Sequence, residues 1–469
     1  MSKVRTAPGT SSSPAAPWTP PADLLPPRTS EAREGAGSAP SIPPDLLETA
    51  GHWILSDLVD LALRTSPQTR VAWAQASSAA ADLGAKGGAY YPTIAGVLGV
   101  SAVRGSVAGG RLSFQNQSTN PFVALNWLLL DFGGRRATVD SARQALIAAD
   151  WTHNAVIQDV VLDVQRAFFQ YLYARALEES EEAAVKEAAT SLDAAEARRA
   201  VGLSTIADVL QAKTRLSEAR LALETVQGEL QTIHGSLATA LGLPANTPFE
   251  VALPSYELPE DQATVAVERA IEEAQLQRPD LAAARSLVEK AQADLRAKEA
   301  ADRPTLNAAV TTGRIWYAPF TLHQDTYTAS LLLTIPIFNG LTYHYNVFKA
   351  EADRDAARAR FDTLEQQVTF QVWSSYYSHK TAAQQVATAK DLLLSAGQSY
   401  EVVSARYKAG VGSILDLLLA QSSLERARAQ EARARTDWFL TLAQLTHDTG
   451  SLWRPTQADA PAPAMEGTR

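Results

Sequence analysis

Two aspartates that follow glycine turns are the side chains with the clearest chemical potential in this 469-residue chain. Asp208 stands three positions after Thr205, and Asp416 stands three positions after Ser413. A hydroxyl residue followed at this spacing by an acidic residue is typical of a helix capping box, in which side chains bond free backbone amides. The helix dipole also favours a carboxylate in a first turn. The spacing therefore predicts hydrogen bonding at two helix starts.

The residue types that usually carry catalysis or bind metals are sparse. The chain has no cysteine, which excludes disulfides, thiolate metal sites and a lipidated N-terminal cysteine. Its seven histidines are scattered without an i, i+3 or i, i+4 pair, so each is expected at the surface. No Walker loop, Gly-x-Ser-x-Gly elbow or His-Glu-x-x-His motif is present. The sequence therefore predicts a protein that is not an enzyme and uses no cofactor or metal.

The composition describes a large acidic chain. Hydrophobic residues make up 46% of it, and 42 basic residues stand against 51 acidic ones, for a net charge of −9. Without a basic patch, nucleic acid is not an expected partner. No run of 18 apolar residues is present, so no transmembrane helix is expected. Charge runs such as 178–182 (Glu-Glu-Ser-Glu-Glu) are expected to be solvated helix faces.

The first 48 residues differ from the rest. Residues 1–48 are rich in Pro, Ser, Ala and Gly, which is typical of a disordered or extended leader. No apolar core of a secretory signal follows Met1. If the protein is exported, we interpret the start as incomplete or misassigned, with a different export route as the alternative.

A long internal repeat organises the chain. The order helix, two strands, long helix and return helix occurs twice, which indicates a duplicated half-molecule. The copies share landmarks at an offset of 208 residues: Gly202, Asp208 and Leu216 recur as Gly410, Asp416 and Leu424. We therefore expect a leader at 1–48, repeat 1 at 49–242, a proline-rich linker at 243–262, repeat 2 at 263–450 and a flexible tail at 451–469.

Each repeat is predicted to contain two strands and two long helices after its first helix. In repeat 1 we place strands at 93–104 and 121–132, a long helix at 135–201 and a return helix at 205–241. In repeat 2 we place strands at 305–316 and 326–338, a long helix at 341–408 and a return helix at 413–448. The first return helix carries a coiled-coil seam. Apolar residues alternate there at steps of three and four: Val209, Ala212, Leu216, Ala219, Leu223, Val226, Leu230, Ile233 and Leu237.

The strand-like segments alternate apolar with small or polar residues. The clearest case has an apolar face of Tyr327, Ala329, Leu331, Leu333, Ile335 and Ile337. Segments of about ten residues with this period are typical of a membrane barrel wall. A half-buried sheet in a soluble α+β domain shows the same alternation, so both interpretations stay open. If the strands face lipid, the open edges of the sheet must be paired, so several chains must combine their strands into one barrel. Three chains would supply twelve strands, although closure alone does not fix that number.

On these features the chain resembles the TolC-like outer membrane efflux family, the outer membrane factors of tripartite export systems. The resemblance covers about residues 53–450. It rests on Phe132-Gly133-Gly134 and Phe338-Asn339-Gly340 at the strand exits, on Tyr407-x-x-Gly410 followed by 413–421, and on the weaker copy at 202–212.

The resemblance implies a mixed α/β membrane protein that assembles as a homotrimer. Three protomers would form a 12-stranded β-barrel in the outer membrane and an α-helical tunnel across the periplasm. A periplasmic adaptor and an inner-membrane pump would be the partners, and small molecules would pass through passively. The alternatives are an exit duct for type I protein secretion and, from a different class, a soluble coiled-coil scaffold.

The resemblance also assigns roles to individual residues. The turns at Gly202, Gly410 and Gly412 would form the periplasmic tip. There Asp416 would join an acidic ring that favours cations, Tyr407 would join a locking network, and Asp208 would contribute near the constriction. Capping is the alternative role for both aspartates, and seam packing is the alternative for Tyr407.

Two departures from the family pattern concern this tip. Gly412 replaces an arginine of the lock in some relatives, and Leu419 replaces a second aspartate, so the gate is expected to be held differently. At the strand exits, Gly133, Gly134 and Gly340 would let the backbone turn from strand to helix.

Overall fold

The computed structural model describes residues 53–107, 109, 111–252, 266–318 and 322–452. The predicted leader lies outside these residues, as do 253–262 of the predicted linker and 453–469 of the predicted tail. The described residues form two compact units. The first comprises Gln75–Trp151 and Ala282–Thr363; the second comprises 53–74, Thr152–Leu281 and 364–452.

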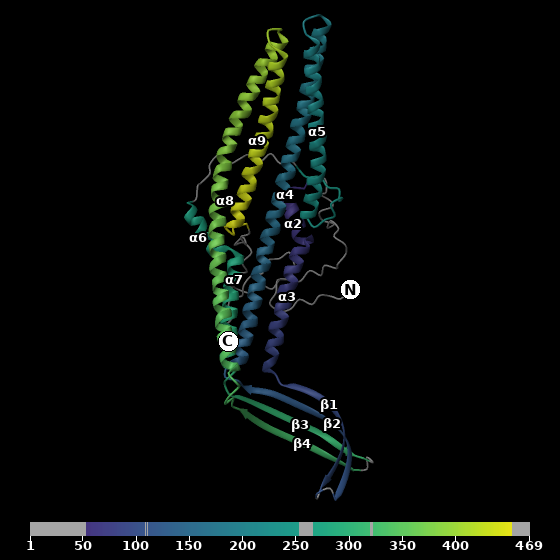
Figure 1. Cartoon of the computed structure of the whole chain (residues 1–469), viewed down its shortest axis with the longest axis vertical. Helices are drawn as coiled ribbons and strands as arrows, with labels where there is room; N and C mark the ends of the chain where they lie inside the picture. Colours follow the sequence, from purple (N-terminus) through teal and green to yellow (C-terminus); the bar gives the residue numbers. More distant parts are fainter. Residues whose placement is uncertain (1–52, 108, 110, 253–265, 319–321, 453–469) are drawn as a thin grey trace, which may run out of the picture. The chain divides into compact units, whose positions relative to one another are not determined.

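A four-stranded antiparallel sheet dominates the first unit, with its strands side by side in the order β1-β2-β3-β4 (Figure 1). The strands are β1 (Thr93–Val107), β2 (Leu112–Leu130), β3 (Thr305–Tyr317) and β4 (Leu322–Thr334). The register places Leu125 opposite Ile94 and Val310 in one row, and Thr311 opposite Thr328 in the next. Because neighbouring residues of a strand point to opposite faces, one face of the sheet is mainly apolar and the other carries small and polar side chains.

The second strand is longer than the sequence predicts. We expected it at 121–132, but β2 begins at Leu112 and ends at Leu130. Asn116 and Gly105 were expected in the connection between the first two strands, but Asn116 pairs with Val103 and Gly105 pairs with Phe114. The turn formers are tolerated because the ladder with β1 satisfies their backbone groups. The ring of Phe114 also lies over Gly105, where an added Cβ would come within 2.7 Å of it.

The last strand ends earlier than predicted. We expected it to run from 326 to 338, whereas β4 spans Leu322–Thr334. Pro336 has no N–H to give to a ladder, so pairing stops before it. The residues after it are exposed, with Ile337 at 95% and Phe338 at 80% of their full accessibility.

Eight α-helices and one short 3-10 helix complete the described chain. They are α2 (Leu55–Thr65), α3 (Pro67–Gly87), η1 (Gly88–Tyr90), α4 (Gly134–Ala200), α5 (Ile206–Ala240), α6 (Val267–Gln277), α7 (Pro279–Ala300), α8 (Thr342–Lys408) and α9 (Ile414–Asp448). The helices α4 and α8 have 67 residues each, and α5 and α9 have 35 each. None of the helices within the described ranges has the length and hydropathy needed to cross a bilayer.

The core of the second unit forms where α2 packs against α4 and the end of α5. Trp53, Leu58, Phe168 and Leu237 are fully buried there, and the rings of Trp53 and Phe249 stack at 5.5 Å. Farther along α5, seven of the nine predicted seam residues are buried: Val209, Ala212, Leu216, Ala219, Val226, Leu230 and Leu237. The helical hairpin of α4 and α5 is therefore held by a narrow apolar seam.

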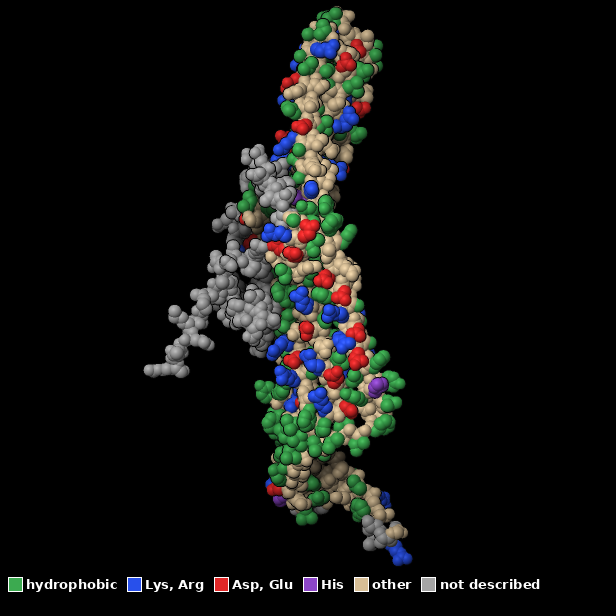
Figure 2. Space-filling model, turned by 90° about the vertical axis from the view of Figure 1, so that its left-hand side faces the viewer, with side chains coloured by type: hydrophobic (Ala, Val, Ile, Leu, Met, Phe, Trp, Pro, Cys, Tyr) green, Lys and Arg blue, Asp and Glu red, His purple; other side chains and the backbone are tan. Residues whose placement is uncertain are grey.

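Many of the exposed large hydrophobic side chains lie on the strands and in the first turns of α8. Ile94 is 69% exposed, Leu331 70%, Tyr345 65% and Phe348 65%. Figure 2 shows hydrophobic side chains crowded in this region, whereas Lys, Arg, Asp and Glu side chains mix along the helices. An apolar surface of this extent marks contact with lipid or with another protein.

The expectation that every histidine lies at the surface is wrong for His153 and for the half-buried His234, His379 and His447. His153 is fully buried on α4. His447 bridges two carboxylates, with Nε2 2.9 Å from Asp159 and Nδ1 3.1 Å from Asp448. Burial lowers the pKa of His447, but the hydrogen bonds and charges of the two aspartates more than offset it and raise the pKa to about 9.

This bridge predicts a pH-dependent contribution to stability. The folded-state pKa lies above the unfolded value, so the contribution is complete below about pH 6.5 and is lost as the pH rises through 9. Replacing His447 by glutamine should therefore lower the free energy of unfolding by about 2–3 kcal/mol at pH 6 and have little effect at pH 10. Denaturant midpoints across this range measure it, and a loss that does not change with pH would contradict the charged bridge.

Candidate functional site

The two helix turns of the second unit have the same backbone construction. In the first, Gly202 has φ +78° and its N–H donates to Arg199 O; in the second, Gly410 has φ +82° and donates to Tyr407 O. The next residue closes a second bond in each turn, to Arg198 O and to Arg406 O. This is the pattern of a Schellman motif, which needs glycine at the left-handed position. Both α4 and α8 therefore end in the same short reversal.

Gly412 is required for a different reason. An added Cβ would lie 2.9 Å from the Tyr407 nitrogen and 3.1 Å from the Arg406 carbonyl carbon. The backbone of this turn thus packs directly on the last turn of α8. Any larger residue at this position, arginine included, would require the turn to shift.

Asp208 forms a complete capping box at the start of α5. Its Oδ2 accepts from Thr205 N at 2.8 Å and from Ser204 Oγ at 2.9 Å, while Asp208 N donates to Thr205 Oγ1 at 3.2 Å. The hydrogen bonds from Thr205 N and Ser204 lower the pKa of this carboxyl. Asp208 therefore remains ionised in this turn.

Asp416 is different, and the capping box predicted for Ser413 and Asp416 is wrong. Ser413 Oγ accepts from Leu415 N at 3.1 Å, one residue earlier than the box requires. The carboxylate is left on an exposed face of α9 that it shares with Leu415 and Leu419, which are 53% and 57% exposed. Capping hydrogen bonds therefore do not occupy this carboxylate.

Tyr407 lies in the interface between the two hairpins, at the end of α8. It is 4% exposed and packs with Ile414 and Leu417, beside Ala194 of α4. Burial raises the pKa of its phenol, with the Arg198 charge opposing this, and its hydroxyl has no hydrogen-bond partner in the described part of the chain. The Tyr407 side chain therefore contributes to this interface through apolar packing.

Arg198 is the residue that joins the two turns, and sequence reasoning missed it. Its guanidinium lies 4.8 Å from the centre of the Tyr407 ring, and its Nη1 donates to Tyr407 O at 2.6 Å. The cation thus sits at the C-terminal end of α8, where the helix dipole favours positive charge. Its charge also lowers the pKa of Asp208. Arg198 brings Tyr407 and Asp208 into one group, which Asp416 does not join through any hydrogen bond or ion pair of the described residues.

Polar contacts continue this connection along the hairpins. Gln421 of α9 is 3% exposed and its Nε2 donates to Ser191 Oγ of α4 at 2.7 Å. Arg428 pairs with Glu187 at 2.9 Å, and Arg215 of α5 pairs with Glu425. Such half-buried pairs are costly to break from one side. The two hairpins are therefore linked at several levels.

The acidic run at 178–182 is only partly solvated, so that expectation is wrong in part. Ser180 is 8% and Glu181 6% exposed, because this side of α4 packs towards α5. Burial raises the pKa of Glu181, which the charge of Arg215 partly opposes. Only Glu179 and Glu182 of the run are exposed.

The glycines at the strand-to-helix connections are needed for different reasons. Gly133 has φ +104° and Gly340 has φ +67°, conformations that favour glycine. Gly134 has an ordinary φ as the first residue of α4, and an added Cβ would lie 3.2 Å from Asp131 Oδ2. Two of the three predicted exit glycines are thus explained by conformation and the third by limited space.

Arg135 stabilises the first strand-to-helix connection, which joins β2 to α4. Its guanidinium donates to Leu128 O at 2.5 Å and Leu129 O at 2.9 Å, and pairs with Asp131 at 3.4 Å. Replacing Arg135 by alanine leaves these groups without their cation, so the free energy of unfolding should fall by about 2 kcal/mol. Chemical denaturation measures the loss, with the exposed Arg220 replaced by alanine as control. An equal effect of both substitutions would contradict the fastening role.

Sequence reasoning missed Arg198 and Arg135 because neither belongs to a motif. Only the place of Arg198 in the sequence could have drawn attention to it. Arg198 lies in the last turn of a long predicted helix, four residues before the predicted turn glycine. No group of three or more His, Asp and Glu side chains within the described segments could hold a metal ion. The described residues therefore join the two helix turns through charged and apolar contacts.

Comparison with known proteins gives matches over most of the chain. A family model described as outer membrane efflux protein matches residues 58–243 and 270–451. Protein CyaE of Bordetella pertussis is 29% identical over 401 residues, which is 83% of each chain. The pyoverdine export outer membrane protein OpmQ of Pseudomonas aeruginosa is 25% identical over 420 residues, 85% of each chain. A crystal structure of a membrane protein from P. aeruginosa aligns with a TM-score of 0.77 at 23% identity, over 84% of this chain and 93% of that one.

Proposed function

This chain belongs to the outer membrane efflux protein family, and we propose from that premise that it forms the outer membrane duct of a tripartite export system. The observation that carries the proposal is the family match across both halves of a helix-rich chain with one four-stranded sheet. In this role the protein is a passive channel. A periplasmic adaptor and an inner-membrane pump would deliver the cargo and supply the energy.

We further propose that three copies pool their strands. Within one chain β1 and β4 each have a single neighbour, so both edges of the sheet are open. Open edges are not tolerated in hydrocarbon. Three copies would close a 12-stranded barrel with the apolar face towards lipid, and the long helices would continue as a periplasmic tunnel. The equal lengths of α4 and α8, and of α5 and α9, support two equivalent halves in each protomer.

Electron microscopy of the detergent-purified protein, combined with planar-bilayer conductance, tests this assignment. We expect a threefold assembly, retention in the envelope after carbonate extraction, and ion conductance from the reconstituted protein. A water-soluble monomer that carbonate washes from the envelope would overturn the assignment.

For the tip we propose a constriction of mixed character. Leu415, Asp416 and Leu419 share one exposed face of α9. If this face lines the lumen, three copies place one acidic ring between two apolar ones. Apolar constrictions obstruct ions because water leaves them, whereas a carboxylate ring favours cations. The gate would then depend on Leu419 as much as on Asp416.

Replacing Leu419 by aspartate should therefore raise the conductance of the resting channel severalfold and increase its preference for cations. Asparagine at 416 should lower that preference without opening the channel. Single-channel recordings with asymmetric KCl measure both properties. The control is aspartate in place of Leu394, an equally exposed leucine of α8 at 62%. Equal conductance of both leucine variants would place the constriction elsewhere.

A further inference from the structure

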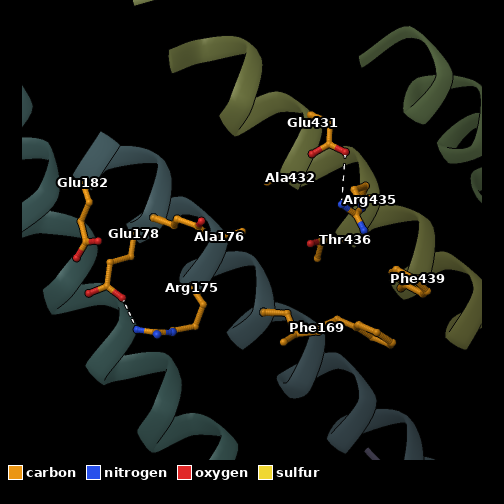
Figure 3. A pocket seen from close by; sticks show the side chains of 12 residues that line it. Phe169, Arg175, Ala176, Glu178, Glu182, Glu431, Ala432, Arg435, Thr436 and Phe439 are labelled. Carbon is orange, nitrogen blue, oxygen red and sulfur yellow. Dashed lines mark hydrogen bonds and ion pairs between the residues drawn. The ribbon is translucent and has the colours of Figure 1, made fainter. Parts of the chain in front are cut away.

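A cavity of about 420 Å³ opens between α4 and α9 in the second unit (Figure 3). Its floor is apolar: the rings of Phe169 and Phe439 stack at 4.9 Å with an interplanar angle of 8°, beside Leu172. Its rim is charged and carries four glutamates and two arginines: Glu178, Glu179, Glu182 and Glu431, with Arg175 and Arg435. A cavity of this size, with an apolar base and a few charged groups, has the character of a small-molecule site.

The two helices are bridged on both sides of the cavity. Towards the turns, Glu187 pairs with Arg428 at 2.9 Å. Towards the other end of α9, Asp159 pairs with His447 at 2.9 Å. Between these bridges the rings of Phe169 and Phe439 stack, and Arg166 donates to Gln444 Oε1. The cavity lies beside the stacked rings, on the side towards the turns.

Two ion pairs at the cavity each join residues of the same helix. Arg175 pairs with Glu178 at 2.5 Å on α4, and Arg435 lies 3.7 Å from Glu431 on α9, as the dashed lines in Figure 3 show. Glu179 and Glu182 have no ion-pair partner among the described residues. Two carboxylates are thus in excess at the mouth of a cavity whose base is aromatic.

We propose that this cavity binds a small amphipathic organic cation. Its aromatic or aliphatic body would rest on Phe169, Leu172 and Phe439, and its ammonium or iminium charge would lie between Glu179 and Glu182. An organic cation matches both parts of the lining, because aromatic edges exclude water from its body while the carboxylates compensate its charge. A bound cation would also add a contact between α4 and α9 beside the Phe169–Phe439 stack. The site goes beyond duct activity, since it needs neither the lumen nor a neighbouring copy.

Fluorescence titration of the detergent-purified full chain with berberine, an aromatic cation whose emission rises in apolar surroundings, tests the proposal. We expect saturable binding with Kd about 10–100 µM, in the range of modest drug-sized ligands. High salt should weaken it because the rim carboxylates are screened. Fluorescein, an aromatic anion, should not bind.

Two variants separate the charge of the rim from the shape of the cavity. The double substitution Glu179→Gln/Glu182→Gln should weaken berberine binding about tenfold or more. Ala176→Phe fills the cavity without removing charge and should abolish saturable binding. The matched control is Glu224→Gln/Glu229→Gln, two exposed glutamates of α5 outside the cavity, which should leave binding unchanged.

Absence of saturable binding by the unmodified protein would overturn the site. Binding that survives Ala176→Phe would do so too, because it would reflect surface charge alone. Conductance of the same variants is measured in parallel and should stay at the level of the unmodified protein. A non-conducting protein that still binds berberine would speak against the duct and leave the cation site intact.

Discussion

Replacing Asp150 by asparagine is expected to stabilise the protein by several kcal/mol at neutral and alkaline pH. Asp150 lies on α4 with no exposed surface, and both carboxylate oxygens lack a hydrogen-bond partner in the described part of the chain. Burial raises its pKa from 3.8 to about 8. A carboxyl group in such surroundings stays protonated, because ionisation without a partner is costly.

The sign of the effect follows from proton binding. Between pH 3.8 and 8 the unfolded chain releases this proton and the folded chain keeps it, so the free energy of unfolding falls as the pH rises. Each pH unit in this window costs about 1.4 kcal/mol, which amounts to about 4 kcal/mol at pH 7. Asparagine has no proton to lose, so the variant should not show this decline.

Denaturant midpoints of the unmodified protein and Asp150→Asn between pH 4 and 9 measure the difference. The two curves should lie close together at pH 4 and separate steadily up to about pH 8. Asp193→Asn, on an exposed position of the same helix, is the matched control and should follow the unmodified protein. Parallel curves for Asp150→Asn and the unmodified protein would show that Asp150 is ionised in the folded state.

Replacing Arg198 by alanine should release the connection between the two helix turns. The substitution removes the charged hydrogen bond to Tyr407 O and the contact of the guanidinium with the Tyr407 ring. Together these interactions contribute about 3–4 kcal/mol, with the hydrogen bond and the cation–π contact of similar size. If the turns close the proposed duct, the ratio of closed to open channels should fall about 100-fold or more.

Single-channel recording in planar bilayers measures that ratio as open probability. Lysine at 198 should restore only part of the closure, since an ammonium cannot stack and donate in the way a planar guanidinium does. Arg220→Ala, on an exposed position of α5, is the control and should gate normally. An unchanged open probability in Arg198→Ala would mean that the turns are held by the apolar contacts of Tyr407 alone.

Helix order, turns and seams were largely predictable from the sequence. Gly202 follows a stretch of 67 residues without proline or glycine, and both Gly202 and Gly410 adopt the left-handed conformation that their position demands. The seam of α5 follows its three-and-four spacing. These features depend on residues a few positions apart, whose interactions the local sequence specifies.

Strand limits and charge environments were predicted less well. β2 includes residues 112–120, whose composition suggests a turn, because pairing with β1 satisfies their backbone. Ser413 and Asp416 have the spacing of a capping box but do not form it, whereas Thr205 and Asp208 do. Local spacing makes such bonds available, and the surrounding packing selects among them.

The amino-acid order alone therefore establishes where helices begin, where they reverse and which stripe of each helix is apolar. It cannot show that Arg198 reaches Tyr407, that Asp150 and Glu181 lose contact with water, or that α4 and α9 enclose a charged cavity. Those features join residues up to about 270 positions apart, as Phe169 and Phe439 illustrate. They arise only when distant helices come to lie side by side, because burial and long-range electrostatics depend on neighbours in space.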